Sequence, residues 1–143
     1  MFSLLLSWSA FSLYAQSDKV KAYVEQGIAL HDKGDYKGAI EEYQKALALD
    51  AASPMVNYEI ASSYFAAKDY DKALKHINVT LQKETEFADH AYILKGSVLD
   101  LQGKSKEAIA VYKNALRTHQ DNYLLYYNLA LTLFNSKASV TET

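Results

Sequence analysis

The sequence predicts an all-α fold, a right-handed α-solenoid of stacked helix-turn-helix repeats, on three observations. The 143-residue chain contains a single proline, which permits long helices. Apolar residues recur at helical spacing. Small residues recur with a period of 34 or 35 residues, the signature of a repeat architecture. They form three series in one register: Gly27, Ala61, Gly96 and Ala130; Ala39, Ala73 and Ala108; Ala46, Thr80 and Ala115.

The first period, residues 20–53, reads as two helices joined by a short turn. A first helix is expected to end near Asp32, because Gly34 can adopt the left-handed conformation and Asp35 can cap the next helix. Apolar residues at steps of four, three and four then predict one buried face of a second helix, made of Tyr36, Ile40, Tyr43 and Leu47.

The next two periods, residues 54–88 and 89–122, repeat this plan. Lys68 replaces the turn glycine in the second period, which predicts a strained or differently closed turn, whereas Gly103 restores it in the third. The one extra residue of the chain falls between Lys83 and Asp89, in a turn between repeats. Residues 123–136 predict a single helix, either the first helix of a fourth repeat or a capping helix, and residues 137–143 a disordered tail.

These positions resemble the tetratricopeptide repeat (TPR) family over about residues 20–134. The family pattern has a small residue at repeat position eight, alanine at twenty, an aromatic at twenty-four and alanine near twenty-seven, as in Gly27, Ala39, Tyr43 and Ala46. The resemblance implies a non-enzymatic scaffold that mediates protein–protein interaction, although a fold alone does not determine function.

In this family, ligands usually lie in the concave groove lined by the first helix of each repeat. The mixture of aromatic, aliphatic and acidic residues at the corresponding positions favours an extended peptide or a partner helix with apolar and basic character. The lysine and asparagine clamp with which chaperone-binding members hold a terminal carboxylate has no counterpart here. The groove candidates are Glu25, Ile28, Tyr58, Glu59, Ser62, Phe65, Ile93, Ser97, Asp100, Tyr127 and Asn128.

Neither catalysis nor a cofactor or metal site is predicted. The chain has no cysteine, and its four histidines stand in no metal-ligand spacing with one another or with acids. It has no phosphate-binding glycine loop, so we expect no catalytic residue, no cofactor and no small-molecule substrate. A net charge of −2 without a basic stripe argues against nucleic acid as a partner.

Residues 1–15 differ from the rest, since they carry no charge and are rich in Leu, Phe and Ser. This run is short for a membrane span but fits a signal peptide cleaved after Ala15, although no Lys or Arg follows Met1. The prediction is an exported protein, periplasmic or secreted. The alternative is a membrane anchor through this N-terminal segment.

Two other functions remain open from the sequence. The chain is either a structural array fragment that stacks on itself or on further repeats through its exposed end, or a docking or regulatory domain of a larger envelope protein or enzyme.

Overall fold

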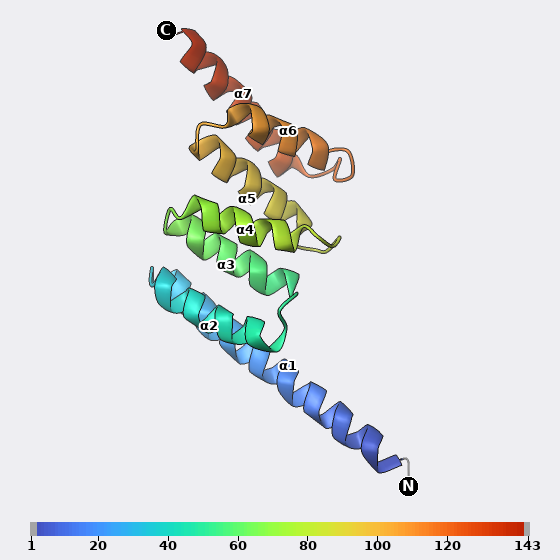
Figure 1. The fold of residues 1–143 in the computed structure, drawn as a ribbon. Helices are drawn as coiled ribbons and strands as arrows, with labels where there is room; N and C mark the ends of the chain where they lie inside the picture. The colour runs from blue at the N-terminus through green and yellow to red at the C-terminus, as the bar shows by residue number, and fades with distance from the viewer. Residues whose placement is uncertain (1–2, 142–143) are drawn as a thin grey trace.

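A computed structural model describes residues 3–141 of the chain, and the side chains of residues 16–137. The described part consists of seven helices that stack in chain order, which confirms the predicted all-α solenoid (Figure 1). The helices are α1 (Ser3–Asp32), α2 (Tyr36–Leu49), α3 (Pro54–Ala66), α4 (Tyr70–Thr80), α5 (Ala88–Leu101), α6 (Ser105–Ala115) and α7 (Tyr123–Thr141).

The helices pack as sequential pairs, α1 with α2, α3 with α4, and α5 with α6, and these pairs form the most extensive contacts of the fold. Successive first helices also touch one another, α1 with α3, α3 with α5, and α5 with α7. Successive second helices make no such contact within the described residues. The first helices therefore form the inner, concave side of the stack, and the second helices form its outer side.

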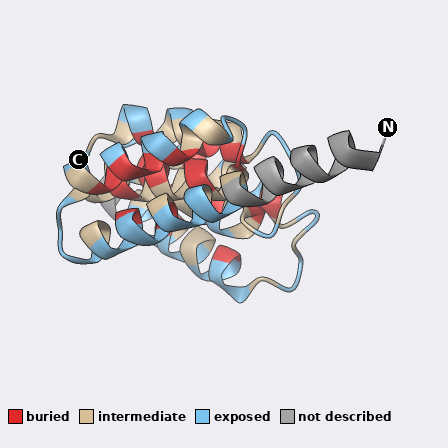
Figure 2. Ribbon diagram, turned by 90° about the horizontal axis from the view of Figure 1, so that it is seen from below, coloured by how far each residue is buried: buried red, intermediate tan, exposed pale blue. Residues whose placement is uncertain are grey.

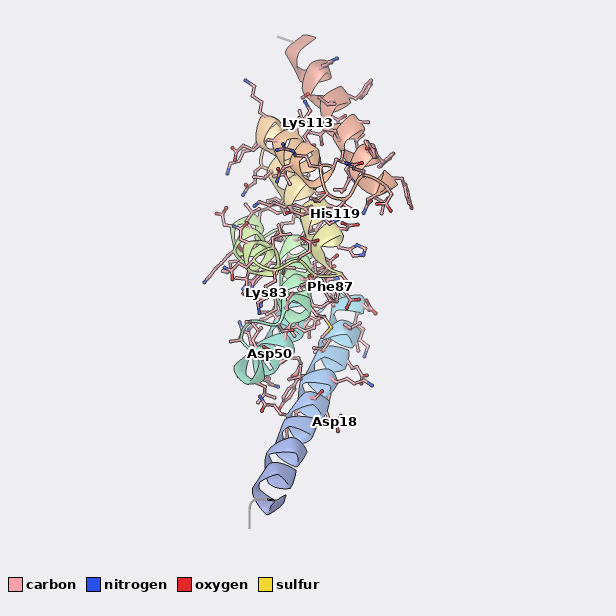
Figure 3. All side chains as sticks on the ribbon, turned by 90° about the vertical axis from the view of Figure 1, so that its right-hand side faces the viewer. Asp18, Asp50, Lys83, Phe87, Lys113 and His119 are labelled. Atoms are coloured by element: carbon pink, nitrogen blue, oxygen red, sulfur yellow. The ribbon has the colours of Figure 1, made fainter. Side chains whose placement is uncertain are left out.

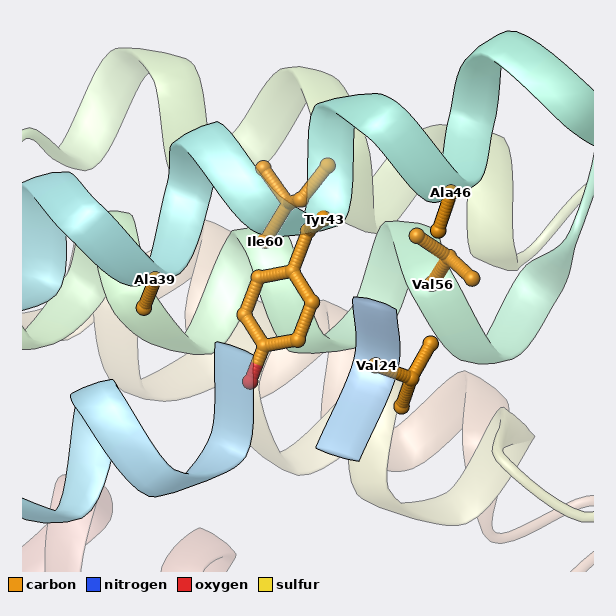
Figure 4. Close-up of a cluster of buried hydrophobic side chains, with 6 residues drawn as sticks. All are labelled: Val24, Ala39, Tyr43, Ala46, Val56 and Ile60. Atoms are coloured by element: carbon orange, nitrogen blue, oxygen red, sulfur yellow. The ribbon is translucent and has the colours of Figure 1, made fainter. Parts of the chain in front are cut away.

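Each pair is closed by a large side chain of the second helix over a small residue of the first. A Cβ atom added to Gly27 would collide with the Tyr43 ring, which is fully buried. Figure 4 shows that ring reaching from α2 toward α1, between Ala39 and Ala46. Buried residues accordingly concentrate where the helices face one another (Figure 2).

The three repeats do not use the same pair of residues. Gly96 of α5 lies under Tyr112 of α6, and a Cβ atom at Gly96 would collide with that ring as well. In the middle repeat, Ala61 of α3 and Ile77 of α4 lie fully buried in one apolar cluster. A larger residue on one helix is thus matched by a smaller one on the other, which keeps the packing dense without overlap.

The turns inside the three repeats share one geometry. Gly34, Lys68 and Gly103 have φ angles of 82°, 62° and 75°, so Lys68 adopts the left-handed conformation that glycine adopts elsewhere. Of the two predicted outcomes, the structure favours a strained turn over a differently closed one, because a side chain at positive φ meets the backbone. Each turn also closes with a Schellman-type hydrogen bond, from Asp35 N to Leu30 O (3.0 Å), Asp69 N to Tyr64 O (2.9 Å) and Lys104 N to Leu99 O (2.8 Å).

Helices α1 and α7 both extend beyond the predicted repeats. Helix α7 continues to Thr141, so residues 137–141 are helical rather than disordered as predicted. The segment SKASVT contains neither glycine nor proline to stop the helix. The predicted signal peptide, residues 1–15, lies outside the described side chains, and export stays a prediction. Among the described residues, no helix combines the length and the apolar character that a membrane crossing requires.

The glycine–tyrosine pair predicts a non-additive response to mutation. Gly96→Ala should lower the free energy of unfolding, because overpacking costs about 1–3 kcal/mol and outweighs a helix-propensity gain of about 1 kcal/mol. The double variant Gly96→Ala, Tyr112→Ile recreates the pair of the middle repeat. It should therefore be more stable in urea unfolding than the sum of the two single changes. Strictly additive effects would contradict this packing rule.

The left-handed lysine predicts a stabilising substitution. Lys68→Gly should raise the free energy of unfolding by about 0.5–1 kcal/mol, because it removes the steric conflict at positive φ. Lys68 is exposed, so little packing is lost. The control is Lys33→Gly, one residue before Gly34 and not at positive φ, which should not stabilise the protein. A stability equal to or below that of the parent at Lys68→Gly would refute the strain.

Candidate functional site

The concave side is formed by residues of α1, α3, α5 and α7 that point away from the second helices. We call it the first-helix surface. It includes the eleven groove candidates predicted from the sequence. The structure divides them into exposed residues at the two ends of the stack, half-buried residues in the middle, and polar residues engaged within the protein. All described side chains are drawn in Figure 3.

The exposed candidates lie on the outermost first helices. Ile28 of α1 is 39% exposed and Tyr127 of α7 is 63% exposed, high fractions for such large apolar side chains. Glu25, one turn before Ile28, makes a single ion pair of 3.8 Å with Lys21, and both side chains are well exposed. An exposed pair of this kind adds little stability, so Glu25 is free to meet a ligand.

The middle of the surface is a half-buried aromatic wall. The ring centroid of Tyr58 lies 6.0 Å from that of Phe87 and 6.0 Å from that of His90. The Phe65 ring lies 6.0 Å from that of Tyr70, which begins α4. Phe87 was missed by the sequence reasoning, because it stands in the irregular turn before α5 and outside the repeat pattern. Ser62 and Ile93 are also half-buried.

Three polar candidates are already bonded within the fold. The Asp100 carboxylate accepts hydrogen bonds from Ser105 Oγ (2.5 Å) and from Thr132 Oγ1 (3.2 Å), and so links α5, α6 and α7. Ser97 Oγ donates to the carbonyl of Ile93 at 2.9 Å, one turn earlier. These contacts make Asp100 an anchor between repeats in this structure.

Asn128 behaves in the same way, since its Nδ2 donates to the carbonyl of Leu124 at 2.8 Å. The apolar residues around Asn128 on α7 are exposed to solvent and could contact a ligand. Phe134 is 72% exposed, and Leu124 and Leu131 are also exposed. No charged residue occurs between Asp121 and Lys137, and this uncharged run is the sequence signal that marks α7 as an apolar surface.

Glu59 gives the first-helix surface its electrostatic character. Burial raises the pKa of its carboxyl, and the nearby negative charge of Asp32 raises it further. Burial and the charge of Glu59 likewise raise the pKa of the Tyr58 hydroxyl. Burial and the charge of Asp32 thus disfavour the ionised carboxylate of Glu59, and a cation beside it would favour ionisation.

A second polar cluster lies beside the start of α5. His119 Nδ1 pairs with Asp89 Oδ1, and Asn122 Nδ2 donates to Asp89 Oδ2 at 2.6 Å. Asn122 Oδ1 in turn accepts the amide of Leu124 at 3.0 Å, which caps α7. The sequence shows no acid in a metal-ligand spacing with His119, and Asp89 lies 30 residues before it. Figure 3 labels His119 and Phe87. The cluster ties the last repeat to α7, and the described residues hold no group of three metal-ligating side chains.

One depression lies away from the first-helix surface, between α2 and the start of α4. It has a volume of about 430 Å³ and includes Glu41, Tyr64, Asp69 and Lys72 in its lining. Two of its charges pair with each other, since Lys72 Nζ lies 2.6 Å from Asp69 Oδ2, and Lys72 Nζ also lies 5.3 Å from the centroid of the Tyr64 ring. This depression follows from the separation of the second helices on the outer side.

Comparison with known proteins identifies a family and several relatives of this chain. A family model described as TPR repeat matches residues 27–68 and 96–136, more than half of the chain. The BBSome complex member BBS4 of Bos taurus is 30% identical over 98 residues, which cover 68% of this chain and 18% of that protein. The photosystem I assembly protein Ycf3 of Prochlorococcus marinus is 26% identical over 144 residues, 88% of this chain and 82% of that protein.

The fold has close counterparts among solved structures. The first TPR of Spaghetti (RPAP3), bound to the HSP90 peptide SRMEEVD, superposes with a TM-score of 0.73 and 25% identity, covering 87% of this chain and 95% of that one. The chain spans about a fifth of the length of BBS4.

The half-buried carboxyl of Glu59 predicts that its replacement by an amide stabilises the protein in a pH-dependent way. Because the pKa of Glu59 is raised in the folded state, ionisation destabilises the fold as pH rises through that pKa. Glu59→Gln should therefore raise the thermal midpoint at pH 7. The gain should vanish below the ordinary value of 4.5, where the carboxyl is protonated in both states. The exposed control Glu25→Gln should shift the midpoint little at either pH, and a gain for Glu59→Gln that persists in acid would exclude this explanation.

Proposed function

Because the chain belongs to the TPR repeat family, we propose that it is a non-catalytic protein-interaction module that binds an extended peptide or a partner helix along the first-helix surface. The observation that carries the proposal is the exposure of Ile28 and Tyr127 at the two ends of a concave, partly aromatic surface. Exposed aromatic and aliphatic side chains around a half-buried wall are the usual anchors of peptide recognition.

The peptide-bound Spaghetti domain supports the proposal that a stack of this length can hold a peptide. That domain is nearly the same length as this chain and holds the seven-residue peptide SRMEEVD. The comparison supports peptide binding by a stack of this extent, while the identity of the ligand has to come from the residues of this chain.

Those residues favour a ligand of opposite charge. The peptide SRMEEVD is acidic at its C-terminal end. The first-helix surface instead presents the exposed carboxylate of Glu25 and the half-buried carboxylate of Glu59. Val24 is buried and the positions of Tyr58 and Ser62 lack a cation, so a terminal carboxylate finds no clamp here. The ligand is therefore a peptide or helix with apolar side chains and at least one Lys or Arg.

A second candidate function is a repeat unit within a longer array or a docking domain of a larger protein. The exposure of apolar residues along α7 favours it, because such a surface in a repeat stack is normally covered by a neighbour. The short share of BBS4 that the chain spans is consistent with it. This second candidate is compatible with ligand binding on the first-helix surface.

The proposal predicts binding that depends on charge. Two labelled ten-residue peptides with the same aromatic and aliphatic residues, one with three lysines and one with three glutamates, are titrated into the protein and followed by fluorescence anisotropy. The basic peptide should bind, more tightly at low salt, and the acidic peptide and SRMEEVD should not. Glu25→Lys should weaken binding of the basic peptide by about three- to tenfold.

The matched control for this charge reversal is Glu41→Lys, an exposed change on the outer face of α2, which should leave the affinity within error. Tyr127→Ser, on an exposed side chain, should weaken binding without changing the circular dichroism of the fold. Equal effects of Glu25→Lys and Glu41→Lys, or tight binding of SRMEEVD, would contradict the proposal.

A further inference from the structure

Glu59 is a half-buried carboxyl of the first-helix surface that lacks a cationic partner. None of the ion pairs formed by the described side chains includes it. Glu42, the buried glutamate of α2, shows the usual arrangement, since Lys45 Nζ lies 2.6 Å from its Oε1. Acidic side chains are rarely buried in proteins unless they are paired. The missing counter-charge at Glu59 is therefore a feature that needs a physical reason.

Glu59 lies where α1 and α3 meet. It stands four residues before Ser63 and so on the same side of α3. Ser63 Oγ lies 2.8 Å from His31 Nδ1 of α1, and the two helices are in contact. The negative charge of Asp32, the residue after His31, also acts on Glu59. The carboxyl thus belongs to the floor of the first-helix surface, between the first and second repeats.

The Tyr43 hydroxyl is a second unsatisfied group at this place. The ring is fully buried, and Figure 4 shows its hydroxyl reaching α1. The hydroxyl lies beside the Glu59 carboxyl, yet among the described residues it has no partner in hydrogen-bonding geometry. The corresponding hydroxyl of the third repeat, on Tyr112, donates to the carbonyl of Ile93 at 3.4 Å. A buried polar group without a partner is uncommon in native proteins and often has a functional cause.

A cation on the concave side would satisfy both groups at once. An ionised carboxylate has lone pairs for several donors. One oxygen of Glu59 would face the cation, and the other would accept the O–H of Tyr43 from inside the protein. An ammonium or a guanidinium group supplies both the charge and the N–H donors, and such charge-assisted hydrogen bonds are the strong ones. The site therefore fits the end of one lysine or arginine side chain.

We propose that Glu59 is the subsite for one lysine or arginine side chain of the bound peptide, and that Tyr43 positions the Glu59 carboxylate through its hydroxyl. This inference rests on the proposed function and adds which carboxylate the ligand cation contacts. Glu25 acts at longer range, because it is exposed and already pairs with Lys21. Glu59 is thus a specificity-determining residue, and Tyr43 is a positioning residue.

Direct pairing with a cation couples peptide binding to a proton. In the protein without ligand, burial and then the charge of Asp32 raise the pKa of the Glu59 carboxyl, so mildly acidic solution protonates it. A bound cation favours the ionised form and releases this proton. The affinity for a basic peptide should therefore rise as pH rises through the raised pKa, and level off above it.

Titratable groups of three helices surround Glu59. Asp32 and His31 belong to the end of α1, Tyr43 to α2, and Tyr58 to α3 itself. Both tyrosines stay neutral in acid, since burial raises the pKa of each hydroxyl. Histidine side chains change charge near neutral pH. The pH test therefore needs a variant that removes the Glu59 carboxyl and keeps His31.

The test uses the basic ten-residue peptide of the preceding subsection, titrated into the full chain and followed by anisotropy. Each of its three lysines is replaced in turn by norleucine, which keeps the aliphatic stem and removes the charge. One replacement should weaken binding to the parent protein about tenfold, and the other two at most about threefold. In Glu59→Gln, all three replacements should have equally small effects, because the carboxylate that pairs with the key lysine is gone.

Glu59→Gln should bind the unmodified peptide about tenfold more weakly at pH 7, although the same change raises the thermal midpoint. Loss of affinity with a gain in stability separates a binding role from a structural one. Between about pH 5 and pH 7, the affinity of the parent protein should fall several-fold toward acid, and that of Glu59→Gln should stay constant.

The positioning role is tested with Tyr43→Phe, which keeps the buried ring and removes the hydroxyl. It should weaken binding about threefold. It should also move the acid loss of affinity to higher pH, because the hydroxyl lowers the pKa of Glu59. The matched control is Tyr112→Phe in the third repeat, which should change neither the affinity nor its pH dependence.

Three results would overturn this inference alone. They are equal affinity of the parent protein and Glu59→Gln, a pH dependence that persists in Glu59→Gln and so comes from His31, and equal effects of Tyr43→Phe and Tyr112→Phe. A parent protein that binds no basic peptide at any pH would instead overturn the proposed function, and this inference with it. The two failures are therefore distinguishable.

Discussion

The close approach of two helices over a residue with little or no side chain is the constraint on which the rest of this structure depends. Gly27, Ala61 and Gly96 let the second helix of each repeat come near enough to bury a large side chain between the two axes. That approach fixes the tilt of each pair, and the repetition of the tilt makes the stack. The concave surface is a consequence, because successive first helices meet while successive second helices diverge.

The repeat plan could be read from the sequence because its determinants are periodic. Small residues and turn signals recur at one spacing, so the sequence predicts the helices and the turn at Lys68 that lacks a glycine. The tail of α7 was predicted wrongly, because its polar composition suggested disorder although nothing in it stops a helix. The fold is therefore the part of the protein that local pattern determines best.

The site was less predictable, because its contacts join residues that no period relates. The Tyr58–Phe87 contact and the Asp89–His119 pair each join the first helix of a repeat to the irregular segment that ends the same repeat. Family positions predict which residues line the surface but not which polar groups are bonded within the fold, as Asp100, Ser97 and Asn128 are. That these residues meet a ligand stays a prediction. Burial of Glu59, which gives the surface its charge preference, likewise follows only from tertiary packing.

The alternation of glycine–tyrosine and alanine–isoleucine pairs also bears on how the chain avoids folding errors. Adjacent repeats are similar enough for a second helix to dock on the wrong first helix while the chain is still assembling. Here, Tyr43 placed over Ala61 would overlap its Cβ atom, and Ile77 placed over Gly27 would leave a void. A second helix docked on the first helix of the neighbouring repeat is therefore less stable than in its own repeat, whichever way it is displaced. Side-chain volume thus favours the native pairing of helices over pairings displaced by one repeat.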